Sequence, residues 1–344
     1  MPLLGALRRV LMAPSLDEVS FTGRAFSLDP TDRTRALEAI PQAVVTGFEW
    51  GIEDRDVATT ERRLALVGPE HRGFAYEGAT MACAIRDATG PRRHRVKTLL
   101  RGGGRDHIFL NYIGIGFAMA KLPRPLWRHL TPTLDTLDGP EFYPALRWLC
   151  VDGYGFDRAY FSTATWVDGQ RRDTPYAFES HTRHTGYWQR AVDQGTGRAL
   201  WFIHGGHTDR VGAAVRAFAA DRHADLFSGV GLAATFAGGA SAASLATLRH
   251  TAGPHAAHLA QGAVFAAKAR HHAGHIPGHS HSALHALTGL SADAAARLAD
   301  DCAPTGPGGD LPSYEIWRRA LRTRLRAAGL FEHAGSRRPA GAPN

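Results

Sequence analysis

The segment FAYEGATMACA, at residues 74–84, has a counterpart in FSGVGLAATFA, at residues 227–237, and this pair decides the fold prediction. In an ungapped alignment the first Phe, the Gly four residues later and the last Ala coincide. Three more pairs follow in the same order: residues 107–121 with 255–269, 145–159 with 283–295, and 188–191 with 317–320. Collinear matches are typical of an internal duplication. We therefore expect two homologous halves of about 150 residues, related by a pseudo-twofold axis.

Helical periodicity dominates both halves, with Asp56, Ser291 and Ser313 as expected N-caps and Gly102 and Gly329 as expected ends. The segment YFSTATWVDGQRR, residues 160–172, alternates β-branched and aromatic residues up to an Asp-Gly turn, which predicts one short β-hairpin. The fold prediction is therefore mainly α, with two tandem helical halves and a small hairpin in the connector. The expected divisions are an N-terminal arm (1–33), a first half (34–159), a connector (160–185), a second half (186–330) and a disordered tail (331–344).

The expected helices carry small residues where a core helix normally carries Leu. A glycine inside a helix costs about 1 kcal/mol relative to alanine, so these glycines need compensation. Either small residues let helix backbones approach closely, or they leave room for an elongated apolar cavity between the halves. The positions concerned include Gly78, Gly114, Gly116, Gly229, Gly231 and Gly262.

Composition narrows the class of protein. The net charge of +8 comes almost entirely from arginines that are scattered along the chain, so we expect no nucleic-acid partner. The arginine run at residues 318–326 steps round every face of a helix, which favours a solvated face. Three distant cysteines and the lack of an 18-residue apolar run predict a cytoplasmic protein without a membrane span.

Several runs of the chain resemble a known bacterial family. They are LMAPSLDEVSF (11–21), RGFAYEGATMA (72–82), DGYGFDRAYF (152–161), DQGTGRALWF (193–202), DLFSGVGLA (225–233) and HLAQGAVFAAKAR (258–270). The chain is similar to domain of unknown function 1702, whose members are typically encoded in enediyne polyketide gene clusters. The resemblance implies an accessory factor that acts beside an enediyne polyketide synthase, whose product is an apolar polyene. It implies no catalytic residues.

Three acidic residues are candidates for proton transfer. Glu77 lies in an apolar, small-residue helix, where burial would raise the pKa of its carboxyl group. The alternative is a carboxylate at a helix start, where the helix dipole stabilises its charge. Asp152 and Asp157 are five residues apart among aromatic residues and are candidates to bind a cation or to protonate an alkene. A turn at Asp152-Gly153 is their alternative interpretation.

Polar residues beside large apolar ones are candidates for binding a substrate. Arg198 and Gln194 are expected either to hold a carboxylate or phosphate of the substrate or, for Arg198, to form a buried pair with Asp193. Gln261 and Lys268 are seven residues apart and share a helix face. Lys121 and Lys268 occupy similar places in the two halves, although a surface lysine is the default.

The histidines give no strong metal pattern. His181, His184 and His279 are the weak candidates, but no His-Glu-x-x-His motif or cysteine partner accompanies them. Six histidines cluster at residues 271–285, and HIPGHSH (275–281) is broken by Pro and Gly, so an exposed His-rich loop is the preferred interpretation. No nucleotide-binding or triad motif occurs, so the residues indicate no particular cofactor.

The sequence thus leads to one functional hypothesis and two rivals. The first is a cytoplasmic enzyme that isomerises or cyclises the polyene, with Glu77, Asp157 and Lys268 as catalytic candidates. Its partners would be the polyene and, beyond it, the polyketide synthase or other pathway proteins. The rivals are a binding protein that sequesters a reactive polyene, and a metal- or haem-dependent oxidative enzyme. The residues proposed to hold the substrate are Arg198, Gln261, Asp152, Lys121 and Gln194.

Overall fold

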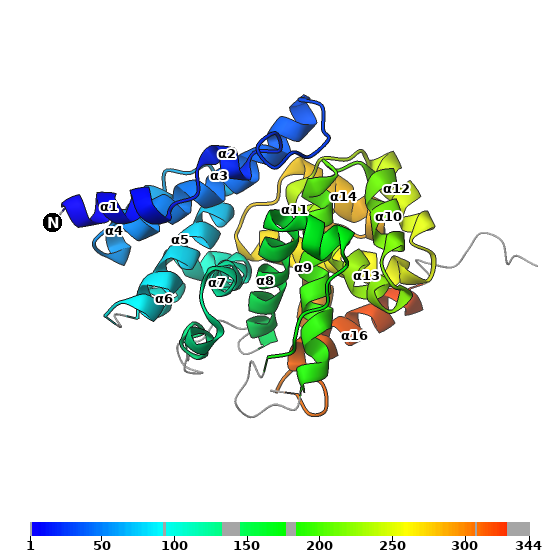
Figure 1. Ribbon diagram of the computed structural model, residues 1–344. Coiled ribbons are helices and arrows are strands. Elements are labelled where there is room, and N and C mark those ends of the chain that lie inside the picture. Colours follow the sequence, from blue (N-terminus) through cyan, green and yellow to red (C-terminus); the bar gives the residue numbers. More distant parts are fainter. Residues whose placement is uncertain (1, 92–93, 133–144, 177–183, 307, 329–344) are drawn as a thin grey trace, which may run out of the picture.

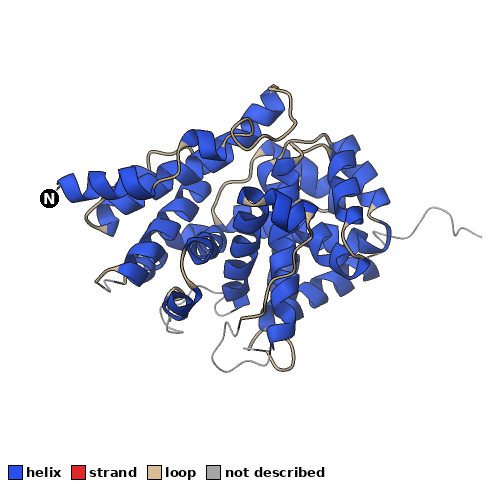
Figure 2. Cartoon of the chain, viewed as in Figure 1, coloured by secondary structure: helices blue, strands red, loops and turns tan. Residues whose placement is uncertain are grey.

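The computed structural model describes residues 2–91, 94–132, 145–176, 184–306 and 308–328, and these form helices joined by short connections (Figure 1, Figure 2). The prediction of a mainly α fold is confirmed. The α-helices are α1 (Pro2–Met12), α2 (Leu16–Val19), α3 (Asp32–Glu53), α4 (Val57–Leu64), α5 (Pro69–Thr89), α6 (Arg95–Arg101), α7 (Ile108–Lys121), α8 (Trp148–Phe161), α9 (Trp188–Ile203), α10 (Thr208–Ala217), α11 (His223–Ala237), α12 (Ala242–Thr251), α13 (Ala256–His272), α14 (Gly278–Thr288), α15 (Ala292–Asp301) and α16 (Ser313–Ala327). Short 3₁₀ turns are η1 (Gly103–His107), η2 (Arg124–His129), η3 (Ala145–Arg147), η5 (His184–Tyr187), η6 (Ala220–Arg222) and η7 (Gly253–His255).

The long helices pack side by side in the order of the chain. α3 packs on α5, α5 on α7, α7 on α8, α8 on α9, α9 on α11, and α11 on α13. The series curls, because Phe74 on α5 meets Phe236 on α11 edge to face, with ring centroids 5.3 Å apart. α14, α15 and α16 cover α13, while α1 and α2 lie along α3 (Figure 1). One continuous hydrophobic core runs through the whole series.

Glycines set the close approach of these helices. A Cβ at Gly78 would overlap the carbonyl oxygen of Val44 on α3, and a Cβ at Gly262 would overlap that of Ser228 on α11. Four central helices each carry two glycines two residues apart, and two residues turn a helix by about 200°, so the pair faces opposite sides. In every pair the first glycine meets the backbone of the preceding long helix and the second meets that of the following one. The pairs are Gly114 and Gly116 on α7, Gly153 and Gly155 on α8, Gly195 and Gly197 on α9, and Gly229 and Gly231 on α11.

This packing confirms the first explanation of the small residues, namely close approach of backbones. It also shows that the aligned glycines of residues 74–84 and 227–237 do not make equivalent helix contacts. Gly78 faces the helix before it, as Gly229 does, whereas Gly231, its partner in the alignment, faces the helix after it. The closely packed pair α8 and α9 spans the expected connector, so the core is continuous across that boundary. The division into two halves stays a prediction.

The predicted hairpin at residues 160–172 is wrong. α8 continues to Phe161, and Ala164–Asp168 form a π-helical turn closed by the N–H of Gly169, which donates to the carbonyl of Ala164 over 2.9 Å. Trp166 is buried in this turn and meets Tyr154 edge to face at 6.1 Å between ring centroids. The aromatic and β-branched residues therefore lie in a helical turn that packs against the core, and they do not form a β-strand. Residues 177–183 of the expected connector and the expected tail at 331–344 lie outside the described residues.

Helix ends follow the sequence signals in most places. Asp56 and Ser291 cap α4 and α15, and Gly102 ends α6, as predicted. Ser313 is instead the first residue of α16, whose N-cap is Pro312. Among the described residues no helix is both long and apolar enough to cross a membrane.

Candidate functional site

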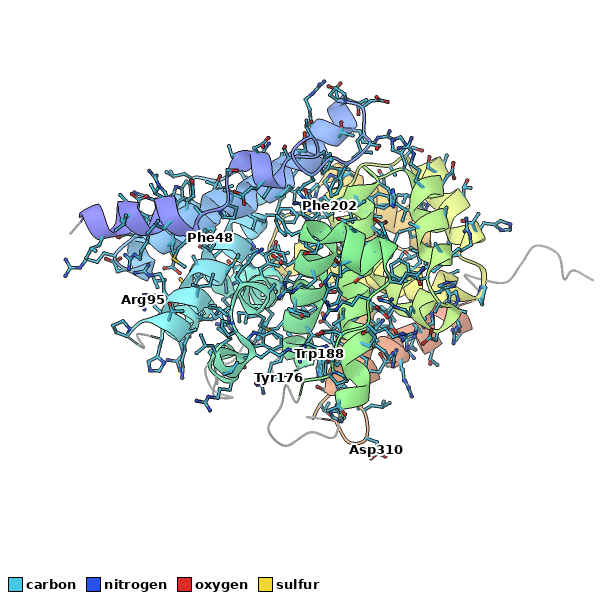
Figure 3. The ribbon with its side chains drawn as sticks, viewed as in Figure 1. Phe48, Arg95, Tyr176, Trp188, Phe202 and Asp310 are labelled. Carbon is cyan, nitrogen blue, oxygen red and sulfur yellow. The ribbon has the colours of Figure 1, made fainter. Side chains whose placement is uncertain are left out.

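An apolar slot lies among the first helices of the series. Its walls come from α3, α5, α7, α8 and α9, and the N-terminal arm contributes Pro14 and Val19. Phe48 on α3 and Phe202 on α9 are two of the wall residues and come from distant parts of the chain (Figure 3). The slot has a cavity volume of about 70 Å³. The space is therefore narrow, and it suits a slim chain better than a bulky ring system.

Aromatic rings dominate the inner surface of the slot. Phe156 on α8 is their centre, with its ring centroid 5.6 Å from Phe117, 5.6 Å from Tyr160 and 5.7 Å from Phe202. Such rings present negative faces that attract cations. The guanidinium carbon of Arg198 already lies 5.0 Å from the Phe156 ring centroid.

Glu77 is the polar group in the middle of this apolar surface. It lies inside α5 and not at its start, so the helix-start interpretation is wrong. Gly78 packs on α3 and Gly114 of α7 packs on the backbone of Glu77 itself, which leaves the glutamate wedged between two close helix contacts. Its side chain faces the slot and is only 2% exposed.

The environment of Glu77 favours the protonated acid. Burial raises the pKa of its carboxyl group to about 8, and Asp152 adds to this rise while Arg198 opposes it. Oε1 of Glu77 is buried without a hydrogen-bond partner, and its distance to Nη2 of Arg198 is 3.9 Å. An unbonded buried carboxylate oxygen is costly, whereas a protonated carboxyl group is tolerated. At neutral pH Glu77 therefore carries a proton.

Arg198 is committed mainly to Asp152. Its Nη1 donates to Oδ1 of Asp152 in a short, fully buried ion pair. The other oxygen of Asp152 accepts a 2.7 Å hydrogen bond from Nε2 of Gln194. The alternative pairing of Arg198 with Asp193 is wrong, because Asp193 binds Arg222 instead.

Asp152 and Asp157 lie inside α8, so the turn interpretation is wrong as well. Gly153 does not end the helix because it faces the backbone of Ile113 on α7 and makes a close helix contact. Asp157 lines the slot and is 4% exposed, and its Oδ2 lies 3.1 Å from Nζ of Lys121. Burial raises the pKa of Asp157, and the neighbouring ammonium group of Lys121 opposes this rise.

The N-terminal arm is fastened over the slot. Nη2 of Arg24 donates to the carbonyl oxygens of Tyr160 and Phe161 at 3.0 and 2.9 Å, at the end of α8 where carbonyls lack helical partners. The hydroxyl of Tyr160 donates to the carbonyl of Val19 over 2.7 Å. These bonds hold the arm against the aromatic wall, where Pro14 and Val19 form part of the lining of the slot.

A buried chain of hydrogen bonds leads away from the slot through Gln194. The hydroxyl of Ser228 donates to Gln194 over 3.2 Å, and Nε2 of Gln261 donates to Ser228 over 3.2 Å. Oε1 of Gln261 accepts from Arg318 and Arg322 on α16 at 3.1 and 3.0 Å. Gln261 is thus a link in the core and does not line the slot.

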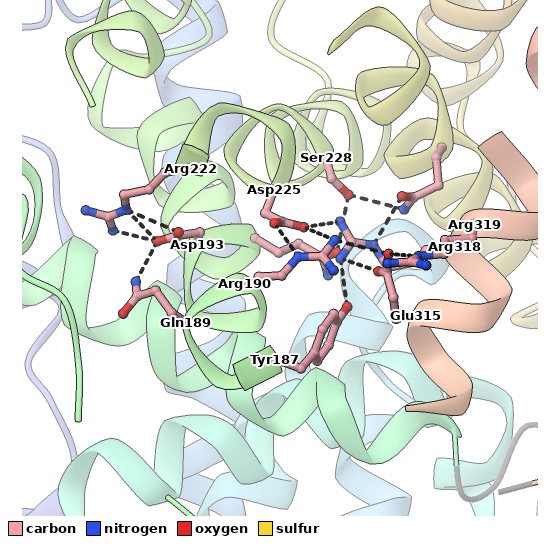
Figure 4. Close-up of polar contacts among 12 residues, drawn as sticks. Tyr187, Gln189, Arg190, Asp193, Arg222, Asp225, Ser228, Glu315, Arg318 and Arg319 are labelled. Atoms are coloured by element: carbon pink, nitrogen blue, oxygen red, sulfur yellow. Dashed lines mark hydrogen bonds and ion pairs between the residues drawn. The ribbon is translucent and has the colours of Figure 1, made fainter. Parts of the chain in front are cut away.

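Two arginines of α16, Arg318 and Arg322, are buried and correct the prediction of a solvated face, whereas Arg319, Arg324 and Arg326 are exposed as predicted. Arg318 is fully buried and binds Asp225 at 2.7 Å, Glu315 at 3.1 Å and the hydroxyl of Tyr187 at 2.7 Å (Figure 4). Burial raises the pKa of Glu315, but Arg318, Arg190 and Arg322 outweigh it and hold this pKa at about 2. The ion pairs of this cluster join α16 to α9 and α11. The spacing of the arginines in the sequence does not distinguish this buried cluster from a run of exposed arginines.

The two lysines that the sequence paired lie in different places. Lys121 on α7 lines the slot, whereas Lys268 on α13 has its Nζ 2.7 Å from Oδ1 of Asp300 on α15 and does not line it. Of the predicted residues, the slot therefore collects Glu77, Asp157, Lys121 and Arg198 directly. Asp152 and Gln194 support Arg198 from behind, and the sequence reasoning missed the aromatic residues around Phe156.

The weak metal candidates lie apart. Nε2 of His184 is 2.8 Å from the carbonyl of Gly309, and Nε2 of His279 is 3.2 Å from that of Phe236. His181 lies outside the described residues. The part of the chain that the structure describes holds no group of three or more His, Cys, Asp and Glu side chains placed to share a metal ion. The expected His-rich loop is shorter than predicted, since α13 ends at His272 and α14 already begins at Gly278.

Comparison with known proteins gives one match. The family described as "Protein of unknown function (DUF1702)" matches residues 3–325. Neither a curated protein nor a solved structure matches the chain.

Proposed function

Because the chain belongs to the DUF1702 family, whose description leaves the function open, we propose a function from the slot: acid/base isomerisation or cyclisation of a slim, apolar polyene. The observation that carries the proposal is the buried Glu77, whose Oε1 has no hydrogen-bond partner among the described residues, facing an aromatic, narrow cavity; burial raises the pKa of its carboxyl group to about 8. The resemblance of the chain to proteins encoded in enediyne gene clusters supports the polyene of an enediyne polyketide synthase as substrate, and that pathway is part of the proposal.

The proposed step begins with proton transfer from Glu77. The acid donates its proton to one carbon of a double bond, which leaves a carbocation in the polyene and a carboxylate on Glu77. A raised pKa near the working pH suits such a general acid. Arg198, 3.9 Å away, stabilises the carboxylate that forms, because attraction to a cation is strong in a dry site.

The aromatic wall then stabilises the carbocation. Phe156 and its neighbours Phe117 and Phe202 line the slot, and cation–π attraction at a desolvated site is worth about 2 kcal/mol per contact. Attack by a second double bond closes a ring, and no attack leads to isomerisation. Loss of a proton from a neighbouring carbon to a carboxylate completes either reaction. The atoms and electrons balance without an oxidant.

Asp157 and Lys121 form the second polar pair of the slot. Lys121 is 40% exposed at its side chain while Asp157 is buried, so this pair stands where the slot nears solvent. We assign Asp157 as the acceptor of the final proton. Lys268, an earlier candidate, has no place in this mechanism because it pairs with Asp300 outside the slot.

The test is co-expression of the protein with an enediyne polyketide synthase, with the polyene followed by its absorbance and its products by mass spectrometry. The wild type should consume polyene, and Glu77→Gln should leave it unconverted while folding normally. Glu49→Gln is the matched control, since Glu49 lies on α3 and does not line the slot. Full conversion by Glu77→Gln would rule out its role as the acid. Polyene that is bound but unchanged by the wild type would favour the binding-protein rival.

A further inference from the structure

A second cavity adjoins the apolar slot. It measures about 430 Å³ and lies among the first turns of α3 and α5, the connection from α11 to α12, and α13 and α14. Ile40 and Phe74 line both cavities, so they form a common wall. The slot is apolar and narrow, whereas this neighbour is wider and has charged side chains in its wall.

A buried arginine is the main charge of the second cavity. Arg270 on α13 is 3% exposed, and its two terminal nitrogens each donate over 2.7 Å to backbone carbonyls, those of Glu70 and Phe236. The guanidinium carbon lies 4.0 Å from the Phe236 ring centroid and 5.5 Å from that of Phe74. These partners carry no formal negative charge, and Nε of Arg270 is buried without a hydrogen bond. Burial lowers the pKa of Arg270 to about 10, so it stays charged at neutral pH.

The remaining wall adds to the positive potential. Arg33, on α3, places Nη2 2.8 Å from Nε2 of His207, and its own Nε is buried without a partner. Glu70 is the one acidic side chain among the described wall residues, and its 47% exposed carboxylate turns to His279 at 3.6 Å. Two guanidinium groups against one carboxylate leave an excess of one positive charge. Ser241, the N-cap of α12, also lines the cavity and brings the positive end of that helix dipole.

One face of α5 lines both cavities. Glu70, Phe74 and Glu77 follow one another at spacings of four and three residues, so they lie along the same side of the helix. Glu70 lines the second cavity, Phe74 lines both, and Glu77 lines the slot. A molecule held along this face would have one end beside Arg270 and its chain beside Glu77.

We propose that the second cavity binds the anionic end, a carboxylate or phosphate, of the molecule whose apolar chain occupies the slot. The anion site stands on Arg270, Arg33 and the cavity itself, and its assignment to the same molecule rests on the proposed function. The substrate class is then a slim polyene with a terminal acid, with Phe74 between head and chain. Among the described residues Arg270 has no carboxylate within ion-pair distance, although the charge of Glu70 acts on it, and such a buried arginine is suited to an anion because charge-assisted bonds are strong.

The experiment uses a fluorescent polyene as probe. Parinaric acid, parinaryl phosphate and parinaric methyl ester share one conjugated chain and differ only in charge at the end. Either anion should bind the wild-type protein at least about tenfold more tightly than the ester, as expected for one charge-assisted contact. The tighter of the two anions identifies the natural head group. Equal affinity for all three probes would overturn the proposal.

Variants of the cavity residues test whether the difference in affinity between acid and ester arises in the second cavity. Arg270→Gln should remove most of the difference between acid and ester, while Arg270→Lys should retain part of it. Because Arg270 also ties α13 to α5, its variants need an unchanged circular dichroism spectrum. Arg33→Gln is the second test, since Arg33 is only partly buried, and it too should weaken the acid but not the ester. An acid-to-ester difference that survives both Arg270→Gln and Arg33→Gln would contradict the assignment.

Glu77→Gln separates this inference from the proposed function. It should still bind parinaric acid more tightly than the methyl ester and yet fail to convert polyene. If it converts polyene normally while the acid keeps its advantage over the ester, the anion site stands and the acid chemistry fails. If it is inactive while acid and ester bind equally, the chemistry stands and the anion site fails.

Discussion

Glu77 and Arg198 form a loose pair, with Oε1 3.9 Å from Nη2, because Arg198 gives its short ion pair to Asp152. One guanidinium group therefore faces two buried carboxyl groups. If both were ionised, the apolar slot would hold an uncompensated negative charge, which is costly at low dielectric. The group that stays neutral is Glu77, whose pKa rises to about 8. This arrangement favours the acid form of Glu77 and leaves Asp152 as the ion-pair partner of Arg198.

The raised pKa of Glu77 predicts how stability depends on pH. The pKa is 4.5 for an ordinary glutamate and about 8 here, so between these values the folded protein binds more protons than the unfolded chain. The stabilisation is complete below about pH 4.5 and is lost as pH rises through about 8, a loss on the order of a few kcal/mol. Urea unfolding of wild type and Glu77→Gln across this range should show a larger loss in the wild type, because Glu77→Gln removes the contribution of Glu77 and keeps those of other buried carboxyl groups such as Asp157. Parallel pH profiles would contradict the assignment.

Removal of the counter-ion should be severe. Asp152→Asn leaves Arg198 buried with only the distant Glu77 for charge compensation, and breaking a buried pair in this way costs about 3–5 kcal/mol. Arg198 then favours ionised Glu77, so the pKa of Glu77 should fall and the pH dependence of unfolding should weaken. Denaturant unfolding at several pH values measures both effects. A variant with unchanged stability and an unchanged pH profile would show that Asp152 does not set the charge of Glu77.

A Gly→Ala substitution should change the stability of the protein in opposite directions at a helix contact and away from one. Gly114→Ala would push a methyl group into the carbonyl of Glu77 on α5, and overpacking of this kind costs about 1–3 kcal/mol. Gly212→Ala, inside α10, is the control because its nearest neighbour is the mobile end of Arg216 at 3.4 Å. Gly212→Ala should stabilise the protein by about 0.5–1 kcal/mol, since alanine favours the helix. Thermal unfolding gives the melting temperature of each variant. A shift of both melting temperatures in the same direction would contradict the packing argument.

The two lysines should differ in their effect on function. Lys121→Met leaves Asp157 buried without its cation, so the pKa of Asp157 should rise further and conversion of the polyene should fall. Lys268→Met alters a pair with the half-exposed Asp300 outside the slot and should leave conversion unchanged in the fraction that folds. Rates of polyene loss, normalised to folded protein, compare the variants. Equal losses from both would place the reaction outside the slot.

Much of the fold could be read from the sequence because helix formation is mainly local. Periodicity and caps such as Asp56 and Ser291 identified the helices, and the glycines marked the close contacts. The errors came where a local signal competes with packing. Gly153 was interpreted as a turn, yet α8 continues because that glycine meets the backbone of Ile113. Arg318 was interpreted as solvated, yet Asp225 and Glu315, one of them distant in sequence, neutralise it in the core.

The candidate site divides in the same way. The sequence determined that Glu77, Asp157 and Arg198 are polar residues set among large apolar ones, and that glycines recur two residues apart in successive helices. Only the tertiary structure decided that Arg198 binds Asp152 and leaves Glu77 unbonded, and that Lys121 lies in the slot while Lys268 does not. The reason is physical. Helix periodicity depends on neighbours within four residues, whereas the charge of a buried carboxyl group depends on which distant helices the glycines bring against it.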